Sequence, residues 1–256
     1  MYPVLIKLGP ITLYTYGLMM ALAMLAAAYY VQRRAGIEGE DPEKALDLAF
    51  YCLIAALVGS RALYIIVEYK QFISNPIAIF KIWEGGLVFY GGFIASALTG
   101  FWFVNKHKLK PWKMADIAAP ALALGHGIGR LGCLFAGCCY GKPTDSWLGI
   151  TFTNPLGLAP KGIALYPTQI FSSLNELTIF VILILVRPYK KFDGQLFLMW
   201  MGLYATGRFI IEGYRGDRRG LSVGELSTSQ GIAIAVAVTA AVVLTILLSK
   251  KKKPVK

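Results

Sequence analysis

Gln230-Gly-Ile-Ala-Ile-Ala-Val-Ala-Val-Thr-Ala-Ala-Val-Val-Leu-Thr-Ile-Leu-Leu248 contains no charged side chain. A helix needs roughly 20 mostly apolar residues to cross the hydrocarbon core of a bilayer. A second run of this kind, Thr168–Val186, holds a single charged residue, Glu176. Both runs are continuous and lack the polar and apolar alternation of a membrane β-strand, so they predict spanning helices.

The composition of the whole chain points the same way. Of its 256 residues, 56% are hydrophobic and 16% are charged, and the mean hydropathy is +0.57. Soluble domains carry about 25% charged residues, so too few charges remain here for a surface that faces water. The five further apolar runs are Leu13–Val31, Ala45–Val67, Gly86–Val104, Met114–Gly137 and Gly194–Glu212. We expect an all-α integral membrane protein of about seven helices, with residues 1–256 as one membrane-embedded domain and 249–256 as a basic tail.

The basic residues predict the orientation, because cytoplasmic loops are enriched in Lys and Arg. Fifteen of the 26 lie in the tail and in the loops on its side of the membrane, eight lie on the opposite side, and three lie within runs. We therefore expect the amino terminus outside and the carboxyl terminus in the cytoplasm. The first run is not expected to be a cleaved signal peptide, because its charges follow it. Topology and anionic lipids explain the net charge of +12 better than nucleic acid does.

The segment Gly125-His-Gly-Ile-Gly-Arg-Leu-Gly-Cys-Leu-Phe-Ala-Gly-Cys-Cys-Tyr-Gly141 is too rich in glycine for an ordinary lipid-facing helix. Glycines permit close helix packing, or a backbone break that protein lines. Arg130 lies inside this segment. Because a buried arginine is costly in a membrane, it should face a cavity, a lipid phosphate or a partner carboxylate. A purely structural pair with Glu212 or Asp116 is the alternative.

A second polar segment runs from Tyr204 to Arg219. Arg208 and Glu212 are four residues apart and therefore share one helix face. They form either a structural pair within the helix or a charged part of a site. The second interpretation is favoured by the charged residues that follow, Arg215, Asp217, Arg218 and Arg219.

Taken together, these segments resemble the signature of the bacterial prolipoprotein diacylglyceryl transferase family. The similar motifs occur in the family's order and cover the chain from about residue 8 to 248. They are Tyr16-Gly-Leu-Met19, Trp83-Glu-Gly-Gly-Leu-Val-Phe-Tyr-Gly-Gly92, Gly129-Arg-Leu-Gly132 with its continuation to Gly141, Tyr166-Pro-Thr-Gln169, Arg208-Phe-Ile-Ile-Glu212 and Leu226-Ser-Thr-Ser-Gln230.

The resemblance implies a multi-pass enzyme of the bacterial cytoplasmic membrane. Such enzymes move a diacylglyceryl group from phosphatidylglycerol to the lipobox cysteine of a prolipoprotein signal peptide, and glycerol 1-phosphate leaves. The implied partners are phosphatidylglycerol, prolipoprotein signal peptides and membrane lipids, with no cofactor. A related enzyme with another acceptor, or a transporter, remains an alternative. By resemblance, Arg130, Gly132 and Gly141 bind the lipid phosphate, and the catalytic residues are Tyr16, Tyr90, Arg208 and Glu212.

The chain also departs from the family's pattern. These departures indicate a divergent branch of the family in which the part of the active site that transfers the proton is altered. Tyr90, Cys133 and Cys138 stand where the family commonly has His, Asn and Glu. Tyr166 and Ser172 stand where it often has His and Glu.

The residue types suggest a chemical role for each candidate site residue. The planar fork of an arginine matches phosphate oxygens, so Arg130 is the first choice for the phosphate and Arg208 the second. Glu212 is either a base or the partner that orients Arg208, because a phenol such as Tyr90 is a poor base near neutral pH. Tyr16 either hydrogen-bonds the headgroup or belongs to the interfacial aromatic belt. His126 is expected to be a hydrogen-bonded packing residue.

Three of the four cysteines, Cys133, Cys138 and Cys139, lie close together in the sequence near the outer face. A disulfide or a lipid-carrying thiol is the alternative there. We favour small packing residues that replace polar ones. No metal is expected, because zinc would lack a fourth ligand at the usual spacing. Cys52, in the middle of a run, should pack as a small apolar residue.

Overall fold

The computed structural model describes residues 2–9, 11–81, 85–217, 222–223 and 226–252. It divides into two compact units, one formed by Met1–Tyr30 with Ala115–Lys256 and the other by Val31–Met114. The described residues are mainly helical, and each of the seven predicted runs overlaps a helix of 18 residues or more. Five of these described helices are long and apolar enough to cross a membrane. They are Thr15–Ile37, Pro42–Val67, Pro111–Ala136, Thr168–Tyr189 and Thr228–Ser249.

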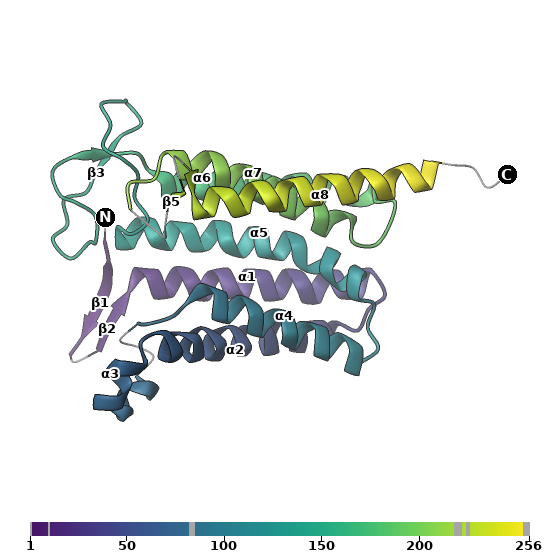
Figure 1. The fold of residues 1–256 in the computed structure, drawn as a ribbon, viewed down its shortest axis with the longest axis horizontal. Helices are drawn as coiled ribbons and strands as arrows, with labels where there is room; N and C mark the ends of the chain where they lie inside the picture. Colours follow the sequence, from purple (N-terminus) through teal and green to yellow (C-terminus); the bar gives the residue numbers. More distant parts are fainter. Residues whose placement is uncertain (1, 10, 82–84, 218–221, 224–225, 253–256) are drawn as a thin grey trace. The chain divides into compact units, whose positions relative to one another are not determined.

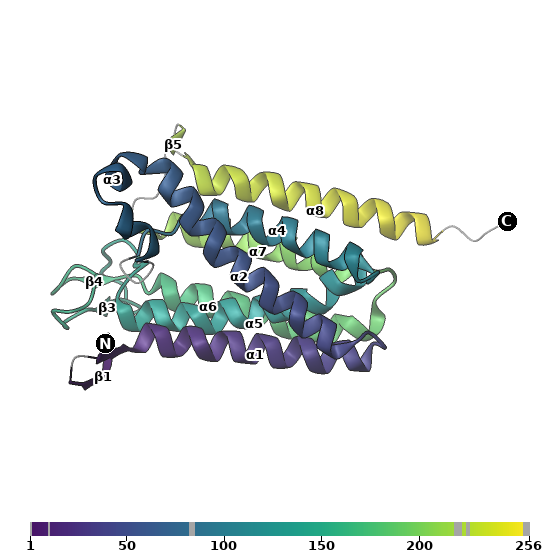
Figure 2. The same ribbon diagram turned by 90° about the horizontal axis from the view of Figure 1, so that it is seen from below.

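Most of the larger unit is a group of long helices that lie side by side (Figure 1, Figure 2). They are α1 (Thr15–Ile37) up to Tyr30, α5 (Pro111–Ala136) from Ala115 on, α6 (Thr168–Val186), α7 (Gln195–Gly213) and α8 (Thr228–Lys252). A short 3₁₀ helix, η3 (Arg187–Tyr189), follows α6.

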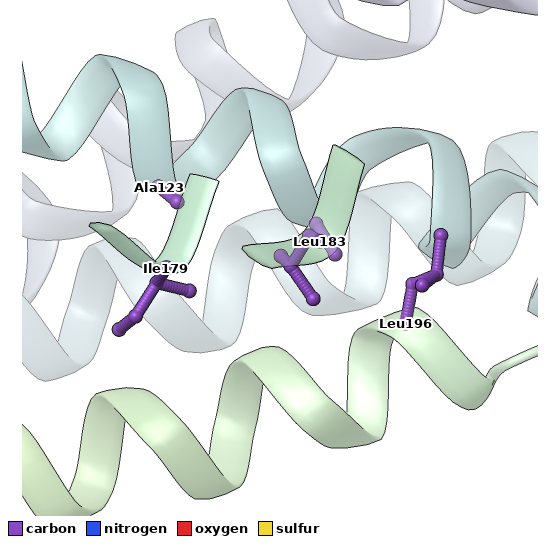
Figure 3. Close-up of a cluster of buried hydrophobic side chains, with 5 residues drawn as sticks. Ala123, Ile179, Leu183 and Leu196 are labelled. Atoms are coloured by element: carbon purple, nitrogen blue, oxygen red, sulfur yellow. The ribbon is translucent and has the colours of Figure 1, made fainter. Parts of the chain in front are cut away.

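A buried apolar cluster joins α5, α6 and α7 (Figure 3). Ala119 and Ala123 of α5 face Ile179 and Leu183 of α6 and Leu196 of α7, and each is at most 3% exposed. Lipid tails are as apolar as these side chains, so helices in a membrane associate through close packing of small against large residues. The two alanines allow that approach, and the cluster fixes the three helices that carry the polar residues described below.

Short strands cover the ends of the helices. β1 (Val4–Leu8) and β2 (Ile11–Tyr14) pair antiparallel just before α1, a hairpin that the sequence analysis did not predict. Thr15, the first residue of α1, donates its backbone N–H to the Pro3 carbonyl at 3.0 Å. Two further pairs are β3 (Ile150–Thr151) with β4 (Ala164–Leu165), and β5 (Ser222–Val223) with β6 (Leu226–Ser227).

The smaller unit is built on α2 (Pro42–Val67) and α4 (Phe89–Lys106), which pack against each other. Between them lie α3 (Tyr69–Ser74) and the 3₁₀ helix η1 (Pro76–Phe80). The two long helices approach closely at glycines. A Cβ atom on Gly92 would lie 2.7 Å from Ser60 Oγ and 2.8 Å from the Ala56 carbonyl oxygen.

Arg61 of α2 is a buried charge to which the sequence analysis gave no role. Its guanidinium donates to backbone carbonyls of the segment that follows α3, those of Ala78, Ile79, Lys81, Gly85 and Gly86. Arg61 also lies over the rings of Tyr64 and Phe72 at 5.5 and 5.4 Å. These hydrogen bonds compensate the cost of burying the guanidinium charge. They also hold the segment between α3 and α4 in place.

Asp116 of α5, which is completely buried, caps the start of α7. Its carboxylate oxygens accept the backbone N–H of Gly194 at 2.8 Å and of Phe197 at 3.0 Å. Carboxylates are favourable at helix amino termini because they satisfy unpaired N–H groups and face the positive end of the dipole. Lys190 Nζ completes the arrangement at 3.1 Å from Asp116 Oδ2.

We predict that Asp116→Ala lowers the free energy of unfolding by about 3 kcal/mol, because it leaves two N–H groups at the start of α7 without their acceptor and removes one of the two carboxylates that pair with Lys190. Thermal unfolding in detergent would measure this. Asp193→Ala is the matched control, since Asp193 pairs with the same Lys190 at 3.0 Å but is about half exposed. An exposed pair of this kind contributes about 0–1 kcal/mol. Equal losses in the two variants would contradict the capping role.

Candidate active site

A chain of three polar side chains crosses from α6 to α5. Glu176 of α6 is 2% exposed, and its Oε1 lies 3.2 Å from Nδ1 of His126. Nε2 of His126 in turn accepts a hydrogen bond of 2.9 Å from Nε of Arg130. Because Nε2 is an acceptor, the imidazole proton lies on Nδ1 and faces the carboxylate. Glu176 therefore orients His126, and His126 fixes one edge of the Arg130 guanidinium.

These side chains face a small cavity to which α5, α6 and α7 all contribute. Its lining residues are His126, Arg130, Ser172, Asn175, Glu176, Tyr204, Arg208 and Ile211. Arg130 and Arg208 lie within electrostatic range of each other. Two guanidinium groups at one cavity repel each other unless an anion or a carboxylate lies between or beside them. Glu212 lies beside Arg208 and offsets part of this repulsion, and the two arginines together would attract a ligand with negative charge.

Arg208 is held by the carboxylate that the sequence analysis paired with it. Glu212 Oε2 lies 2.7 Å from Arg208 Nη2, which confirms the expected pair on one face of α7, and 3.7 Å from Arg215 Nε. Arg215 also pairs with Asp217 at 2.7 Å. A carboxylate shared by two arginines fits the orienting role for Glu212 better than the role of a base. Arg218 and Arg219 lie outside the described residues.

Gly132 lies where α1 and α5 come together. A Cβ atom on it would be 3.1 Å from Met19 Cβ and 3.3 Å from Tyr16 Cδ2. This close approach brings Tyr16, the second residue of α1, within electrostatic range of Arg130. Tyr16 is 42% exposed, so its ring is still partly open to the surroundings.

Gly141 ties the end of the glycine-rich segment to α6 and α7. Its N–H donates to the Tyr166 carbonyl at 2.9 Å, and the next N–H, of Lys142, donates to the Tyr214 carbonyl at 2.8 Å. A Cβ atom on Gly141 would lie 2.5 Å from the Tyr166 oxygen and 2.9 Å from that of Tyr214. Only glycine fits between these backbones. Contact with phosphate at Gly132 and Gly141 stays a prediction.

Tyr90 belongs to the other compact unit, where it is the second residue of α4. It is 54% exposed, and its ring meets that of Phe89 edge-on at 5.8 Å. Trp83 and Glu84, which precede it in the motif, lie outside the described residues. A catalytic role for Tyr90 stays a prediction.

One interpretation from the sequence is wrong and two contacts were missed. Arg130 pairs with neither Glu212 nor Asp116, because Glu212 contacts Arg208 and Asp116 caps α7. Its partner is His126, so the expectation that His126 is hydrogen-bonded is confirmed, while its position between Arg130 and Glu176 was not predicted. Glu176 had been noted only as the one charge in an apolar run. A lone carboxylate in a spanning segment signals function, and that signal could have directed attention to it.

Comparison with known proteins identifies the family. Residues 3–246 match the family described as prolipoprotein diacylglyceryl transferase. A phosphatidylglycerol–prolipoprotein diacylglyceryl transferase of Clostridium tetani is 39% identical over 234 residues, 91% of this chain and 93% of that protein. The transferase numbered 2 of Clostridium perfringens is 40% identical over 222 residues, 87% of this chain and 86% of that protein. The Shouchella clausii transferase is 34% identical over 245 residues, 93% of this chain and 87% of that protein.

The chain therefore belongs to the prolipoprotein diacylglyceryl transferase family, which confirms the resemblance that its motifs suggested. Together with the helices that are long and apolar enough to span a bilayer, this makes it a multi-pass membrane protein.

Proposed function

We propose that this chain transfers the diacylglyceryl group of phosphatidylglycerol to the lipobox cysteine thiol of prolipoprotein signal peptides, with release of glycerol 1-phosphate. The observation that carries the proposal is the cavity lined by both Arg130 and Arg208. An anionic lipid phosphate is a ligand for which two guanidinium groups are suited. The family and the names of its relatives support the same reaction.

The membrane arrangement is part of the proposal. All seven long helices cross the bacterial cytoplasmic membrane, with residues 1–12 outside and the basic tail after Leu248 in the cytoplasm. Fifteen of the 26 basic residues on one side support this orientation. The end of α5 that carries Arg130 then lies toward the outer leaflet, the side on which secreted preproteins arrive.

The arginines stabilise the leaving group. When the acceptor sulfur attacks the glyceryl carbon, the bond between that carbon and the phosphate oxygen breaks, and negative charge accumulates on the departing phosphate. The terminal nitrogens of Arg130 meet that charge, while His126 holds its Nε. Arg208, oriented by Glu212, is the second donor. Preorganised donors of this kind usually make the largest contribution to catalysis, and water exclusion strengthens them.

The two tyrosines assist the reacting groups. Tyr16 hydrogen-bonds the lipid headgroup, next to the Arg130 with which it interacts electrostatically. Tyr90 takes the place of a histidine common in the family, and its hydroxyl supplies the hydrogen bond that an imidazole would supply elsewhere.

Expression in a bacterium depleted of its own transferase tests the proposal, with mass spectrometry of one lipoprotein as the readout. The wild-type chain should restore lipidation. Arg130→Ala should abolish it, since the loss of one preorganised donor costs on the order of 10²- to 10³-fold in rate. Arg130→Lys should restore little activity, because an ammonium group lacks the planar guanidinium that can donate two parallel hydrogen bonds to a phosphate. Arg34→Ala, which removes an arginine paired with Glu38 in the other unit, is the control. A fully folded wild-type chain that leaves the lipoprotein unmodified would refute the function, and near-normal lipidation by Arg130→Ala would refute the assignment of Arg130.

Tyr90→Phe removes only a hydroxyl, so a change in rate reports chemistry more than packing. We predict a loss of about 10- to 1000-fold in transfer rate. Tyr90→His should keep part of the activity and shift its pH optimum downward, because imidazole titrates near 6.5. Transfer to a lipobox peptide in detergent would measure both. If the pH profile of Tyr90→Phe overlays that of the parent at saturating lipid, Tyr90 is an interfacial aromatic residue and the proposal for it fails.

A further inference from the structure

The structure brings three thiols together just beyond Arg130. Cys133 lies in the last turn of α5, and Cys138 and Cys139 lie in the turn that follows the helix. All three Sγ atoms lie within 4.8 Å of one another, and those of Cys138 and Cys139 are 3.8 Å apart. The fourth cysteine, Cys52, belongs to α2 in the other unit.

Buried side chains from the start of α6 hold this turn in place. Gln169 Nε2 donates to the Cys138 carbonyl at 2.8 Å, and Thr168 Oγ1 donates to the Cys139 carbonyl at 2.7 Å. Both donors are at most 1% exposed. Cys139 has a left-handed backbone with φ of +60°. Side chains rarely adopt that conformation, and where it persists it commonly accompanies a functional constraint.

The spacing of the sulfur atoms suits a thiophilic cation. Zinc–thiolate bonds are about 2.3 Å long and tetrahedral, so two bound sulfur atoms lie about 3.8 Å apart. The pair Cys138 and Cys139 has that separation already. Cys133 lies close enough that a small side-chain rotation would complete a three-thiolate face. Three protein ligands with one open position are typical of catalytic rather than structural zinc sites.

The three thiols lie close in sequence and in space to Arg130, the residue proposed to bind the phosphate. Cys133 follows Arg130 by three residues in α5, which places the two on neighbouring positions of one helix face. Tyr16 lies within electrostatic range of Arg130 and of all three thiols. A group bound to the three thiols is therefore within electrostatic range of the residues proposed to hold the lipid headgroup.

We propose that Cys133, Cys138 and Cys139 bind one Zn²⁺ ion whose fourth ligand is the acceptor cysteine of the prolipoprotein. This inference rests on the proposed function. Binding to zinc releases the thiol proton to water, since coordinated thiols are deprotonated. The thiolate electron pair then forms the carbon–sulfur bond to the glyceryl carbon, and the carbon–oxygen bond breaks. Glycerol phosphate leaves with that electron pair and the thioether leaves the metal.

The proposal accounts for the residues in which the chain departs from its family's pattern. By the resemblance, Cys133 and Cys138 stand where the family commonly has an amide and a carboxylate, and a metal that generates the thiolate makes a strong base unnecessary. The objection to zinc from the sequence was the missing fourth ligand. It does not apply if the substrate supplies that ligand.

Metal content of the full-length chain in detergent tests the site without using activity. After zinc loading and desalting, mass spectrometry of the metal should find about one zinc ion per chain, as three thiolates and an exchangeable fourth ligand require. Cys133→Ser, Cys138→Ser and Cys139→Ser should each fall to near background, while Cys52→Ser keeps the wild-type value. Thermal unfolding of each serine variant identifies any that fail to fold.

The Co²⁺-loaded chain should show thiolate-to-cobalt charge-transfer absorption. A lipobox peptide should change that spectrum, and the same peptide with its cysteine replaced by serine should not.

The outcomes separate the metal site from the transferase function. If the wild-type chain holds no zinc after loading, whether its thiols are reduced or joined in a disulfide, the proposed metal site is wrong. Lipidation at an unchanged rate by chelator-stripped protein would contradict the role of zinc in activating the acceptor thiol and would leave the transferase function intact. Zinc and peptide binding by a chain that never lipidates would support the site and contradict the transferase function instead.

Discussion

The hydrogen-bonded chain Glu176–His126–Arg130 is the constraint on which the rest of the site depends. A charge inside a spanning segment is stable only if it is paired or faces a polar cavity. Here a buried carboxylate and a guanidinium are joined through one imidazole, at 3.2 and 2.9 Å. Removing one member of a buried charged set leaves the other without compensation and typically costs 3–5 kcal/mol. The chain therefore couples the register of α6 on α5 to the orientation of Arg130.

Arg208, the second arginine at the cavity, is positioned by contacts at both ends of its helix, α7. At the start of α7, Asp116 of α5 accepts the N–H groups of Gly194 and Phe197. At its other end, the segment around Gly141 is hydrogen-bonded to backbone from before α6 and after α7. The alanine and leucine cluster fills the space between (Figure 3). Arg208 therefore reaches the cavity from a helix that is held at its start by α5 and at its end by the segment that follows α5.

The helices could be predicted from the sequence because each depends on a continuous apolar run. Thr168–Val186 was predicted with the bounds that the structure gives it. The pair Arg208 and Glu212 could also be predicted, since helical periodicity brings residues four apart together. The contact between His126 and Arg130 has the same spacing of four residues, so helical periodicity could have indicated it as well. The contact between His126 and Glu176 could not be predicted. It joins residues 50 positions apart in sequence, and the sequence alone does not fix the register of α6 on α5. The carbonyl contacts of Arg61 were missed because they join residues 17 to 25 positions apart. The hairpin of β1 and β2 was missed although its pairing is local.

The central claim is that Glu176 acts on the reaction through His126 and the Nε of Arg130. A double-mutant cycle tests it most directly, with the rate of diacylglyceryl transfer to a lipobox peptide at limiting phosphatidylglycerol as the readout. Glu176→Gln keeps the shape of the side chain and removes its charge. In the wild-type background it should lower kcat/KM by about 10- to 100-fold, as the loss of an orienting partner does. In an Arg130→Lys background, which lacks the Nε contact, Glu176→Gln should cost little more, so that the two losses are not additive. Equal fold losses in the two backgrounds would contradict the account and reduce Glu176 to a residue that only stabilises the fold.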